Sequence, residues 1–278
     1  MTQLLPKVEF AVQSLYKEQK YCPHCGSTAI SNVAKKYARV SVKRCDNCKL
    51  SFTSPIYRSA LVSEFYDFLY GAEGSTTEVP EANKLAELKK LNFANTDKYF
   101  ADRIARMKSI SPGKRLLEIG SSWGYFLYQA RSQGFDVTGV ELSDSRRKVG
   151  IEELELNIVK DFSALSSDRF DLVYTAHTLE HFIDLSSIFN EINSVLVNNG
   201  FLVIEVPNFD YDLFGESVLS IVGAIHPLGF SSQFFKDNLP KYGFDIIGFF
   251  DNWHNFPDHA TDRCREDVVL LLAKKRAN

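Results

Sequence analysis

The chain has 278 residues, 45% of them hydrophobic and 24% charged, which is the composition of a globular protein and not of a disordered one. A net charge of −3 excludes a protein that is basic throughout, but residues 1–58 hold ten Lys and Arg against three Asp and Glu. No stretch is apolar for long enough to cross a bilayer, and the N-terminus has no signal-peptide core. We therefore expect a cytoplasmic protein whose thiols are reduced.

Two C-x-x-C pairs stand in the basic front of the chain, formed by Cys22, Cys25, Cys45 and Cys48. With reduced thiols, this spacing favours a metal over disulfides, and two such turns close a tetrahedral Cys₄ site for structural Zn²⁺. Residues 37–43 alternate as a strand does and lead into the second pair, so we predict a zinc ribbon over residues 1–57. The complete cysteine set makes His24 a bystander, and Cys264 is expected to be an ordinary thiol.

Residues 58–110 are predicted to form a helical linker or lid. An aromatic cluster near its start comprises Phe65, Tyr66, Phe68 and Tyr70. A Gly-Ser-Thr break near 71–77 precedes a charged amphipathic run over residues 80–110. Core packing explains most of the aromatic residues, although Tyr66 and Tyr70 are also weak candidates for an acceptor site.

From residue 111 onward, strand and helix patterns alternate, which indicates an α/β layout with a parallel sheet and a terminal hairpin strand. Strands are predicted at residues 115–119, 136–142, 158–160, 170–175, 201–206, 244–250 and 268–274, and helices at 125–134, 185–196 and 232–242.

The first of these strands ends in a glycine turn with the spacing E-x-G-x-x-x-G, from Glu118 through Gly120 to Gly124. Closely spaced glycines let the backbone approach a ligand and aim the following helix N-terminus at it. A dinucleotide site would use G-x-G-x-x-G for a pyrophosphate, which the carboxylate of Glu118 would repel. The turn instead favours a cofactor with an ammonium group, such as S-adenosylmethionine.

Acidic residues follow the next two strands. Glu141 ends the second strand, where acidic residues accept hydrogen bonds from ribose hydroxyls. Asp161 and Phe162 follow the third strand and could bind an adenine amino group and cover the ring. All three positions suit a nucleoside-type cofactor.

The chain resembles a class I S-adenosylmethionine-dependent methyltransferase over residues 111–278. It has the family's glycine turn, the strand-two end Val140-Glu141-Leu142-Ser143, and the run His177-Thr-Leu-Glu180-His181-Phe182 after strand four. The front, residues 45–55 and 64–70, is similar to the zinc-ribbon lead-in of a bacterial methyltransferase subgroup associated with polysaccharide and natural-product pathways.

The resemblance implies a Rossmann-like seven-stranded sheet, mostly parallel with an antiparallel last strand, behind a small zinc-ribbon domain. It also implies which part of the cofactor each segment holds: the glycine turn holds the methionine portion, the acidic strand ends hold ribose and adenine, and backbone after strand four faces the sulfur. The cofactor-binding residues it implies are Glu118, Gly120, Ser121, Ser122, Gly124, Tyr125, Glu141, Leu142, Asp161, Phe162, Ala176 and His177.

The run from His177 to His181 also reads H-x-x-E-H, a zinc-protease signature with two histidines one helical turn apart. Its place directly after a parallel strand, with no evident third ligand, disfavours that interpretation. His177 and His181 are then cofactor-side or packing residues, and Glu180 orients one of them.

Methyl transfer to a hydroxyl or carbon acid requires a base, and His226 falls after the fifth strand, where acceptors sit. We predict His226 as the catalytic base, with His181 as a second catalytic candidate and His254 and His259 as weaker ones. A structural hydrogen bond is the competing explanation for His226. Zinc-containing sugar C-methyltransferases resemble this region through an E-H-x-x-Y-F-S run, but Ile225 and Gly229 replace its Glu and Tyr, which favours O-methylation.

Three functions remain open. The leading one is methylation of a small-molecule or glycan acceptor, which could bear a phosphate that the basic front would meet. The second is RNA methylation with the ribbon gripping nucleic acid, although the motifs for adenine N-methylation and covalent pyrimidine C5-methylation are absent. The third is a non-catalytic scaffold that binds the cofactor.

Overall fold

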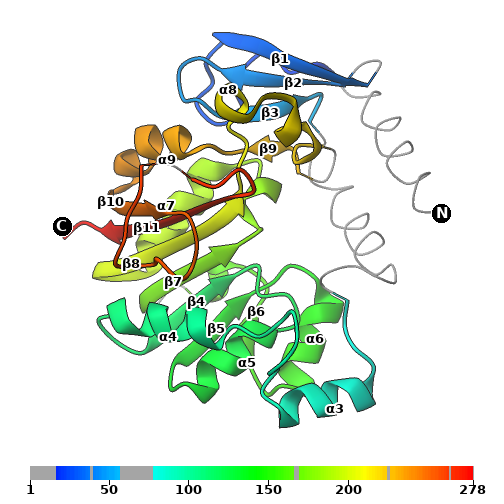
Figure 1. The fold of residues 1–278 in the computed structure, drawn as a ribbon, viewed down its shortest axis with the longest axis vertical. Helices are drawn as coiled ribbons and strands as arrows, with labels where there is room; N and C mark the ends of the chain where they lie inside the picture. The colour runs from blue at the N-terminus through cyan, green and yellow to red at the C-terminus, as the bar shows by residue number, and fades with distance from the viewer. Residues whose placement is uncertain are drawn as a thin grey trace. The chain divides into compact units, whose positions relative to one another are not determined.

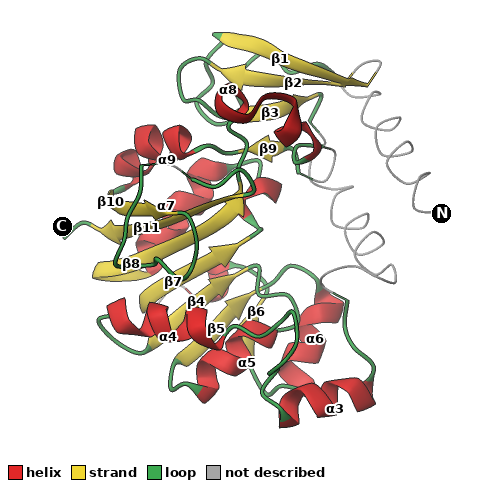
Figure 2. Ribbon diagram, in the orientation of Figure 1, coloured by secondary structure: helices red, strands yellow, loops and turns green. Residues whose placement is uncertain are grey.

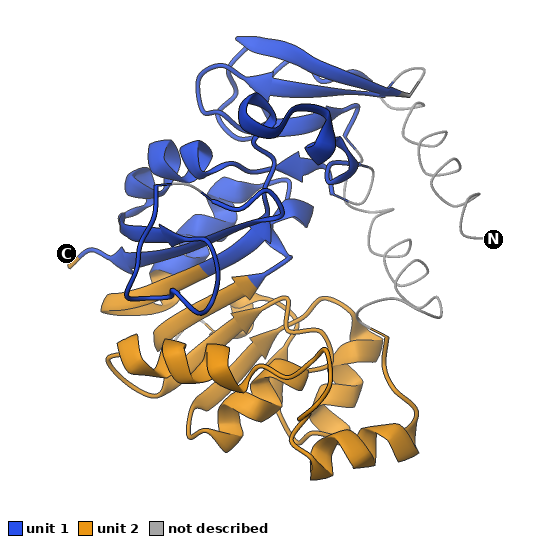
Figure 3. Cartoon of the chain, in the orientation of Figure 1, with its two compact units in different colours: residues 1–59, 176–193, 204–276 blue, residues 60–175, 194–203, 277–278 orange. Residues whose placement is uncertain are grey.

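The structure is a computed structural model of the chain. It describes residues 17–37, 40–56, 78–165, 169–223, 226–262 and 264–277. The chain divides into two compact units (Figure 3). Unit 1 comprises residues 1–59, 176–193 and 204–276, and unit 2 comprises residues 60–175, 194–203 and 277–278. The cysteine-containing front therefore groups with the second half of the chain.

The front forms a four-stranded antiparallel sheet in unit 1 (Figure 1). Its strands, in spatial order, are β1 (Ile30–Tyr37), β2 (Val40–Cys45), β3 (Ser51–Ser54) and β9 (Leu228–Gly229). The predicted strand at 37–43 is wrong in its bounds, because β1 ends at Tyr37 and β2 begins at Val40. The strands β1, β3 and β9 were not predicted. β9 is two residues long and pairs with Ser51 and Phe52 of β3, which lie 178 and 176 residues before their partners Gly229 and Leu228.

A seven-stranded sheet has the order β10-β11-β8-β7-β4-β5-β6 (Figure 2). The strands are β4 (Arg115–Ile119), β5 (Asp136–Val140), β6 (Asn157–Val159), β7 (Phe170–Ala176), β8 (Leu196–Pro207), β10 (Phe244–Phe250) and β11 (Val268–Lys275). β4 pairs in parallel with β5 and β7, β5 pairs in parallel with β6, and β10 pairs antiparallel with β11. The predicted α/β fold with a mostly parallel seven-stranded sheet is confirmed.

The described helices of unit 2 are α3 (Ala82–Lys90), α4 (Ala101–Ile110), α5 (Tyr125–Ser132), α6 (Asp144–Glu152) and the 3₁₀ helix η1 (Phe162–Leu165). The predicted helical character is present over residues 82–110, interrupted between Lys90 and Ala101. The aromatic cluster at 65–70, with Tyr66 and Tyr70, lies outside the described residues. Helix α6 was not predicted because it has few apolar residues; the Ser143 side chain accepts a hydrogen bond from the Arg146 backbone and caps it.

The remaining helices are α7 (Leu185–Val195), α8 (Tyr211–Phe214), α9 (Ser232–Asn238) and the 3₁₀ helices η2 (Leu179–His181), η3 (Gly215–Ser220) and η4 (Leu239–Tyr242). The single helix predicted at 232–242 is α9 followed by η4, which begins at Leu239. Pro240, in the first turn of η4, has no N–H to continue the α-helical ladder. Among the described residues, no helix is both long and apolar enough to span a membrane.

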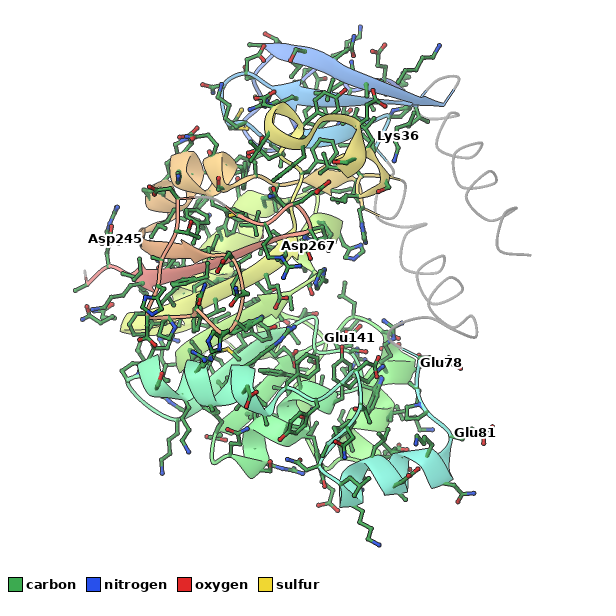
Figure 4. The ribbon with its side chains drawn as sticks, viewed as in Figure 1. Lys36, Glu78, Glu81, Glu141, Asp245 and Asp267 are labelled. Carbon is green, nitrogen blue, oxygen red and sulfur yellow. The ribbon has the colours of Figure 1, made fainter. Side chains whose placement is uncertain are left out.

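The four-stranded sheet of the front is attached to the rest of unit 1 by backbone pairing, apolar packing and side-chain hydrogen bonds. β3 pairs with β9, and Val42 of β2 packs in a buried cluster with Phe209, Val218 and Val222. Lys36 extends from β1 (Figure 4), and its ammonium group donates to the carbonyl oxygens of Leu219 and Val222. The Asn238 amide donates to the Cys48 carbonyl at 2.9 Å. The front therefore shares a buried apolar cluster with residues 209–222.

Candidate active site

The glycine turn after β4 requires backbone conformations that favour glycine. Gly120 and Gly124 have φ angles of +75° and +86°, and Ser122 between them also has a positive φ of 51°. A Cβ at Gly124 would lie 2.4 Å from Cδ1 of Leu156, so the position also lacks room for a side chain. Gly124 is the N-cap of α5, and the turn therefore directs the α5 N-terminus toward the ends of the parallel strands.

Glu118 is a buried carboxyl group at this turn. It is 7% exposed, and within the described part of the chain its Oε2 atom has no hydrogen-bond partner. Burial, and secondarily the neighbouring Glu141 carboxylate, raises the pKa of Glu118 well above its ordinary value. A buried carboxyl without a partner is costly, so the site suits a cation that would ionise and pair it.

Glu141, directly after β5 (Figure 4), is fixed by backbone hydrogen bonds. Its Oε2 accepts from the Ser122 N–H and its Oε1 from the Ser143 N–H, each at 2.8 Å. Each carboxylate oxygen has a second lone pair that these bonds leave available. Glu141 therefore braces the glycine turn and can still accept from a ligand hydroxyl.

Several other buried polar atoms around the turn have no hydrogen-bond partner among the described residues: Ser121 Oγ, Ser122 Oγ and Trp123 Nε1. Native proteins rarely leave buried polar groups unpaired, so such a group of atoms points to a polar ligand. Burial raises the pKa of the adjacent Tyr125, so its phenol stays protonated.

The positions predicted for the adenine end are more exposed. Asp161 is exposed, and the hydroxyl and backbone N–H of Ser163 hold the pKa of Asp161 below its usual range. Phe162 is half-buried at the start of η1, and Leu142 is 58% exposed. An exposed Leu and a half-buried Phe leave apolar surface that a ring could cover.

Unit 1 contains the residues that follow β7. Ala176 is the last residue of β7 and is half-buried. His177, the next residue, is exposed and has a positive φ of 48°. The His177 N–H donates to the Glu205 carbonyl at 2.8 Å, and the Glu205 carboxylate accepts from Trp253 Nε1 at 3.0 Å. The contact between Glu205 and Trp253 was not predicted from the sequence. Its only sign there is that Glu205 is a carboxylate within an otherwise apolar strand.

The H-x-x-E-H run does not form the helix that a zinc-protease site needs. Only Leu179–His181 is helical, as the 3₁₀ helix η2, and His177 precedes it in the left-handed region. His177 and His181 are therefore not stacked one α-helical turn apart, which disfavours the protease interpretation.

Glu180, His181 and His226 do come together in unit 1. Their potential ligand atoms lie within 4.8 Å of one another, and the rings of His181 and His226 are 4.7 Å apart at 75°. Glu180 is 1% exposed, and neither of its carboxyl oxygens has a hydrogen-bond partner among the described residues. Burial raises the pKa of Glu180 to about 8.

His226 is held by a backbone hydrogen bond in which its Nδ1 lies 3.1 Å from the Ile221 carbonyl oxygen. Since a carbonyl only accepts, Nδ1 carries the proton and the Nε2 lone pair remains available. Burial lowers the pKa of His226, which keeps the ring neutral. The other histidine candidates, His254 and His259, are not part of this cluster, and position 225 lies outside the described residues.

The four cysteines of the front lie close together. Cys22 and Cys48 have their sulfur atoms 3.5 Å apart, as do Cys25 and Cys45, and all four sulfurs lie within 4.8 Å of one another. These distances are too long for disulfides, which need about 2 Å, and near the roughly 3.8 Å that four sulfurs adopt around one Zn²⁺. The cluster could hold a zinc ion. His24 packs against Phe234 instead of joining it.

A family model described as "Methyltransferase domain" matches residues 93–248, more than half of the chain. The chain belongs to this methyltransferase family. The match contains the glycine turn, Glu141, Asp161, and the Glu180, His181 and His226 cluster.

Solved structures share the fold of this methyltransferase. A S-adenosylmethionine-dependent methyltransferase from Clostridium acetobutylicum has a TM-score of 0.52 at 13% identity, covering 70% of this chain and 99% of that one. A TehB-like SAM-dependent methyltransferase from Corynebacterium glutamicum has a TM-score of 0.50 at 19% identity, covering 70% and 97%. A comparison with curated proteins gave no significant match.

Proposed function

We propose that this chain transfers the methyl group of S-adenosylmethionine to a hydroxyl of a small-molecule or glycan acceptor. The observation that carries the proposal is Glu118, a buried carboxyl at a glycine turn beside Glu141, whose Oε2 has no hydrogen-bond partner in the part of the chain that the structure describes. A cofactor with an ammonium group would ionise and pair Glu118. When bound, S-adenosylmethionine supplies an electrophilic methyl group on a sulfonium.

The residues of unit 2 would hold that cofactor in a defined order along the sheet edge. The turn from Gly120 to Gly124 would take the amino acid portion, and the remaining lone pairs of Glu141 would accept from the ribose hydroxyls. Asp161 would accept from the adenine amino group, with Phe162 against the ring. Tyr125 is proposed as a neutral hydrogen-bond donor and Leu142 as apolar cover.

On the acceptor side, His226 is the proposed base. Its neutral ring, with the proton fixed on Nδ1 by Ile221, presents Nε2 to take the proton of an acceptor hydroxyl. Gly229 supports O- over C-methylation: a Cβ there would lie 2.7 Å from atoms of Phe209 and Val222, so the tyrosine of the C-methyltransferase run has no room.

Zinc is the proposed occupant of the Cys₄ cluster, with a structural role. Four thiolates fill a tetrahedral shell and leave no open position for chemistry. Its main effect would be to fix β2 and β3, and through β3 the β9 segment that follows His226.

The RNA alternative loses support from the way the ribbon uses its cations. Lys36 donates to backbone carbonyls, Lys43 is 7% exposed and pairs with Glu18, and Arg44 pairs with Asp212. These three cations already have partners within unit 1. The front therefore offers fewer cations to a phosphate backbone than its net charge suggests.

Calorimetric titration of S-adenosylmethionine tests the cofactor site. Glu118→Gln should weaken binding about 10- to 150-fold, the loss expected when a charge-assisted hydrogen bond worth about 1.5–3 kcal/mol is removed. Glu153→Gln, at the exposed end of α6, is the matched control and should bind as the wild type does. Equal affinities for wild type and Glu118→Gln would remove the basis of the proposal.

A further inference from the structure

One cluster of unit 1 has ligand chemistry that methyl transfer does not require. Glu180 and His181 come from η2, and His226 comes from the segment that leads into β9, which contacts η2. The Glu180 carboxyl group is more than nine-tenths buried and has both oxygens unpartnered among the described residues. A carboxyl that only filled the core would pair with a donor, because an unpaired one is costly.

His226, close to Glu180, is held in an orientation that suits a metal ligand. The Nδ1–H of His226 is oriented by the Ile221 carbonyl, which is the second-shell contact that fixes metal-binding histidines and directs Nε2 to the ion. The His177 Nδ1 is 3.9 Å from Glu180 Oε1, beyond hydrogen-bonding distance, and its side chain is 58% exposed.

We propose that Glu180, His181 and His226 bind a divalent transition-metal ion. Two imidazoles and one carboxylate suit Zn²⁺, Fe²⁺ or Co²⁺, whereas Mg²⁺ and Ca²⁺ prefer oxygen ligands alone. Ligands of one ion with bonds of about 2.1 Å lie at most about 4.2 Å apart. In the structure the three ligand atoms lie within 4.8 Å of one another, so rotation of the three side chains would bring them to this distance when the ion binds.

The three protein ligands leave open coordination positions, in contrast to a Cys₄ site. Resting on the proposed function, the inference gives these positions to the acceptor hydroxyl, whose pKa falls on coordination. Its proton leaves to solvent, the O–CH₃ bond forms as the S–CH₃ bond breaks, and the sulfonium becomes a neutral thioether. With the ion bound, Nε2 of His226 coordinates the metal and is no longer available as a base. The metal then activates the hydroxyl in place of His226.

Equilibrium dialysis of the full chain against Co²⁺ tests the site. The protein is first loaded with one equivalent of Zn²⁺, which the four thiolates retain because soft sulfur ligands prefer it to Co²⁺. Wild type should then bind one Co²⁺ per chain, with a visible spectrum that lacks thiolate charge-transfer bands. Glu180→Gln and His226→Gln should each bind at least tenfold more weakly, while the exposed control Glu216→Gln binds as wild type.

Two results would overturn the inference. Either the zinc-loaded wild type binds no Co²⁺, or Glu180→Gln binds Co²⁺ with the same affinity as the wild type. Because Glu180→Gln is nearly isosteric, circular dichroism can verify that the variant is folded. Titration of S-adenosylmethionine into the same Co²⁺-free samples separates the two proposals. Cofactor binding without Co²⁺ binding removes only the metal site, and Co²⁺ binding without cofactor binding removes only the proposed function.

Discussion

Glu118 and Glu180 are buried carboxyl groups, one in each unit; Oε2 of the first and both oxygens of the second have no hydrogen-bond partner among the described residues, and their surroundings differ. Glu118 in unit 2 has a second carboxylate, Glu141, and a glycine turn as neighbours. Glu180 in unit 1 has two imidazoles, from His181 and His226. A glycine turn gives space for an organic cation, whereas imidazoles supply lone pairs to a metal ion. The same unpaired group therefore predicts two different cations, according to its neighbours.

The largest effect is expected from removing one thiolate of the proposed zinc site with Cys45→Ser. Loss of a thiolate should abolish retained zinc, since structural Zn²⁺ contributes about 10–16 kcal/mol to the folding of small zinc modules. Because β3 pairs with β9, hydrogen exchange should rise at Leu228 and Gly229, while β4 in unit 2 stays protected. Cys264→Ser, outside the Cys₄ cluster, is the control. Unchanged zinc content in Cys45→Ser would contradict a structural site.

A crossed comparison of the two carboxyls comes next in size. Glu118→Gln should lose S-adenosylmethionine affinity about 10- to 150-fold and keep Co²⁺, and Glu180→Gln should lose Co²⁺ and keep S-adenosylmethionine in the absence of metal. The two affinities are measured on both variants by calorimetry and dialysis. If either variant lost both ligands, the two carboxyls would not serve separate cations.

Replacement of His226 by alanine tests the acceptor side. Turnover should fall about 10²- to 10⁴-fold, the usual contribution of a general base, with S-adenosylmethionine affinity unchanged. Steady-state rates and cofactor titrations on the same preparation make the comparison. If His226→Ala kept full turnover, His226 would be neither the base nor a metal ligand that the reaction needs.

The affinity for S-adenosylmethionine should also depend on pH through Glu118. Its folded pKa is raised, so at low pH the carboxyl is neutral and cannot pair a cation. Affinity should therefore rise with pH, by up to tenfold per unit, until Glu118 is ionised, and then level off. Without cofactor the sign is opposite: stability falls as pH rises from the unfolded toward the folded pKa. Titrations across pH should show no such slope in Glu118→Gln.

The smallest effect is expected at Gly229 of β9, the strand that follows the His226 segment and pairs with β3 of the front. In Gly229→Ala, the new methyl would meet Phe209 and Val222 at 2.7 Å, and such overpacking costs about 1–3 kcal/mol. Thermal unfolding should show a lower melting temperature than wild type. A melting temperature equal to that of wild type would show that these side chains have room to move.

Sequence patterns located most of the α/β core, because its strands are apolar and its turns contain glycine. The parallel strands at 115–119 and 170–176 agree with the predicted bounds to within one residue. β9 escaped prediction because it depends on pairing with β3, and α6 because its pattern is polar. The Glu180 cluster could be seen only in part, since the sequence does not reveal that residue 226 returns to η2.

The fate of a labelled methyl group tests the central claim most directly. The full chain is incubated with S-adenosylmethionine labelled on the methyl group, together with nucleotide sugars, glycans, small metabolites and RNA. The account predicts label on the hydroxyl oxygen of a small-molecule or glycan product, and much less label with Glu118→Gln at a subsaturating concentration of S-adenosylmethionine. Label in RNA, or equal labelling by wild type and Glu118→Gln, would contradict it.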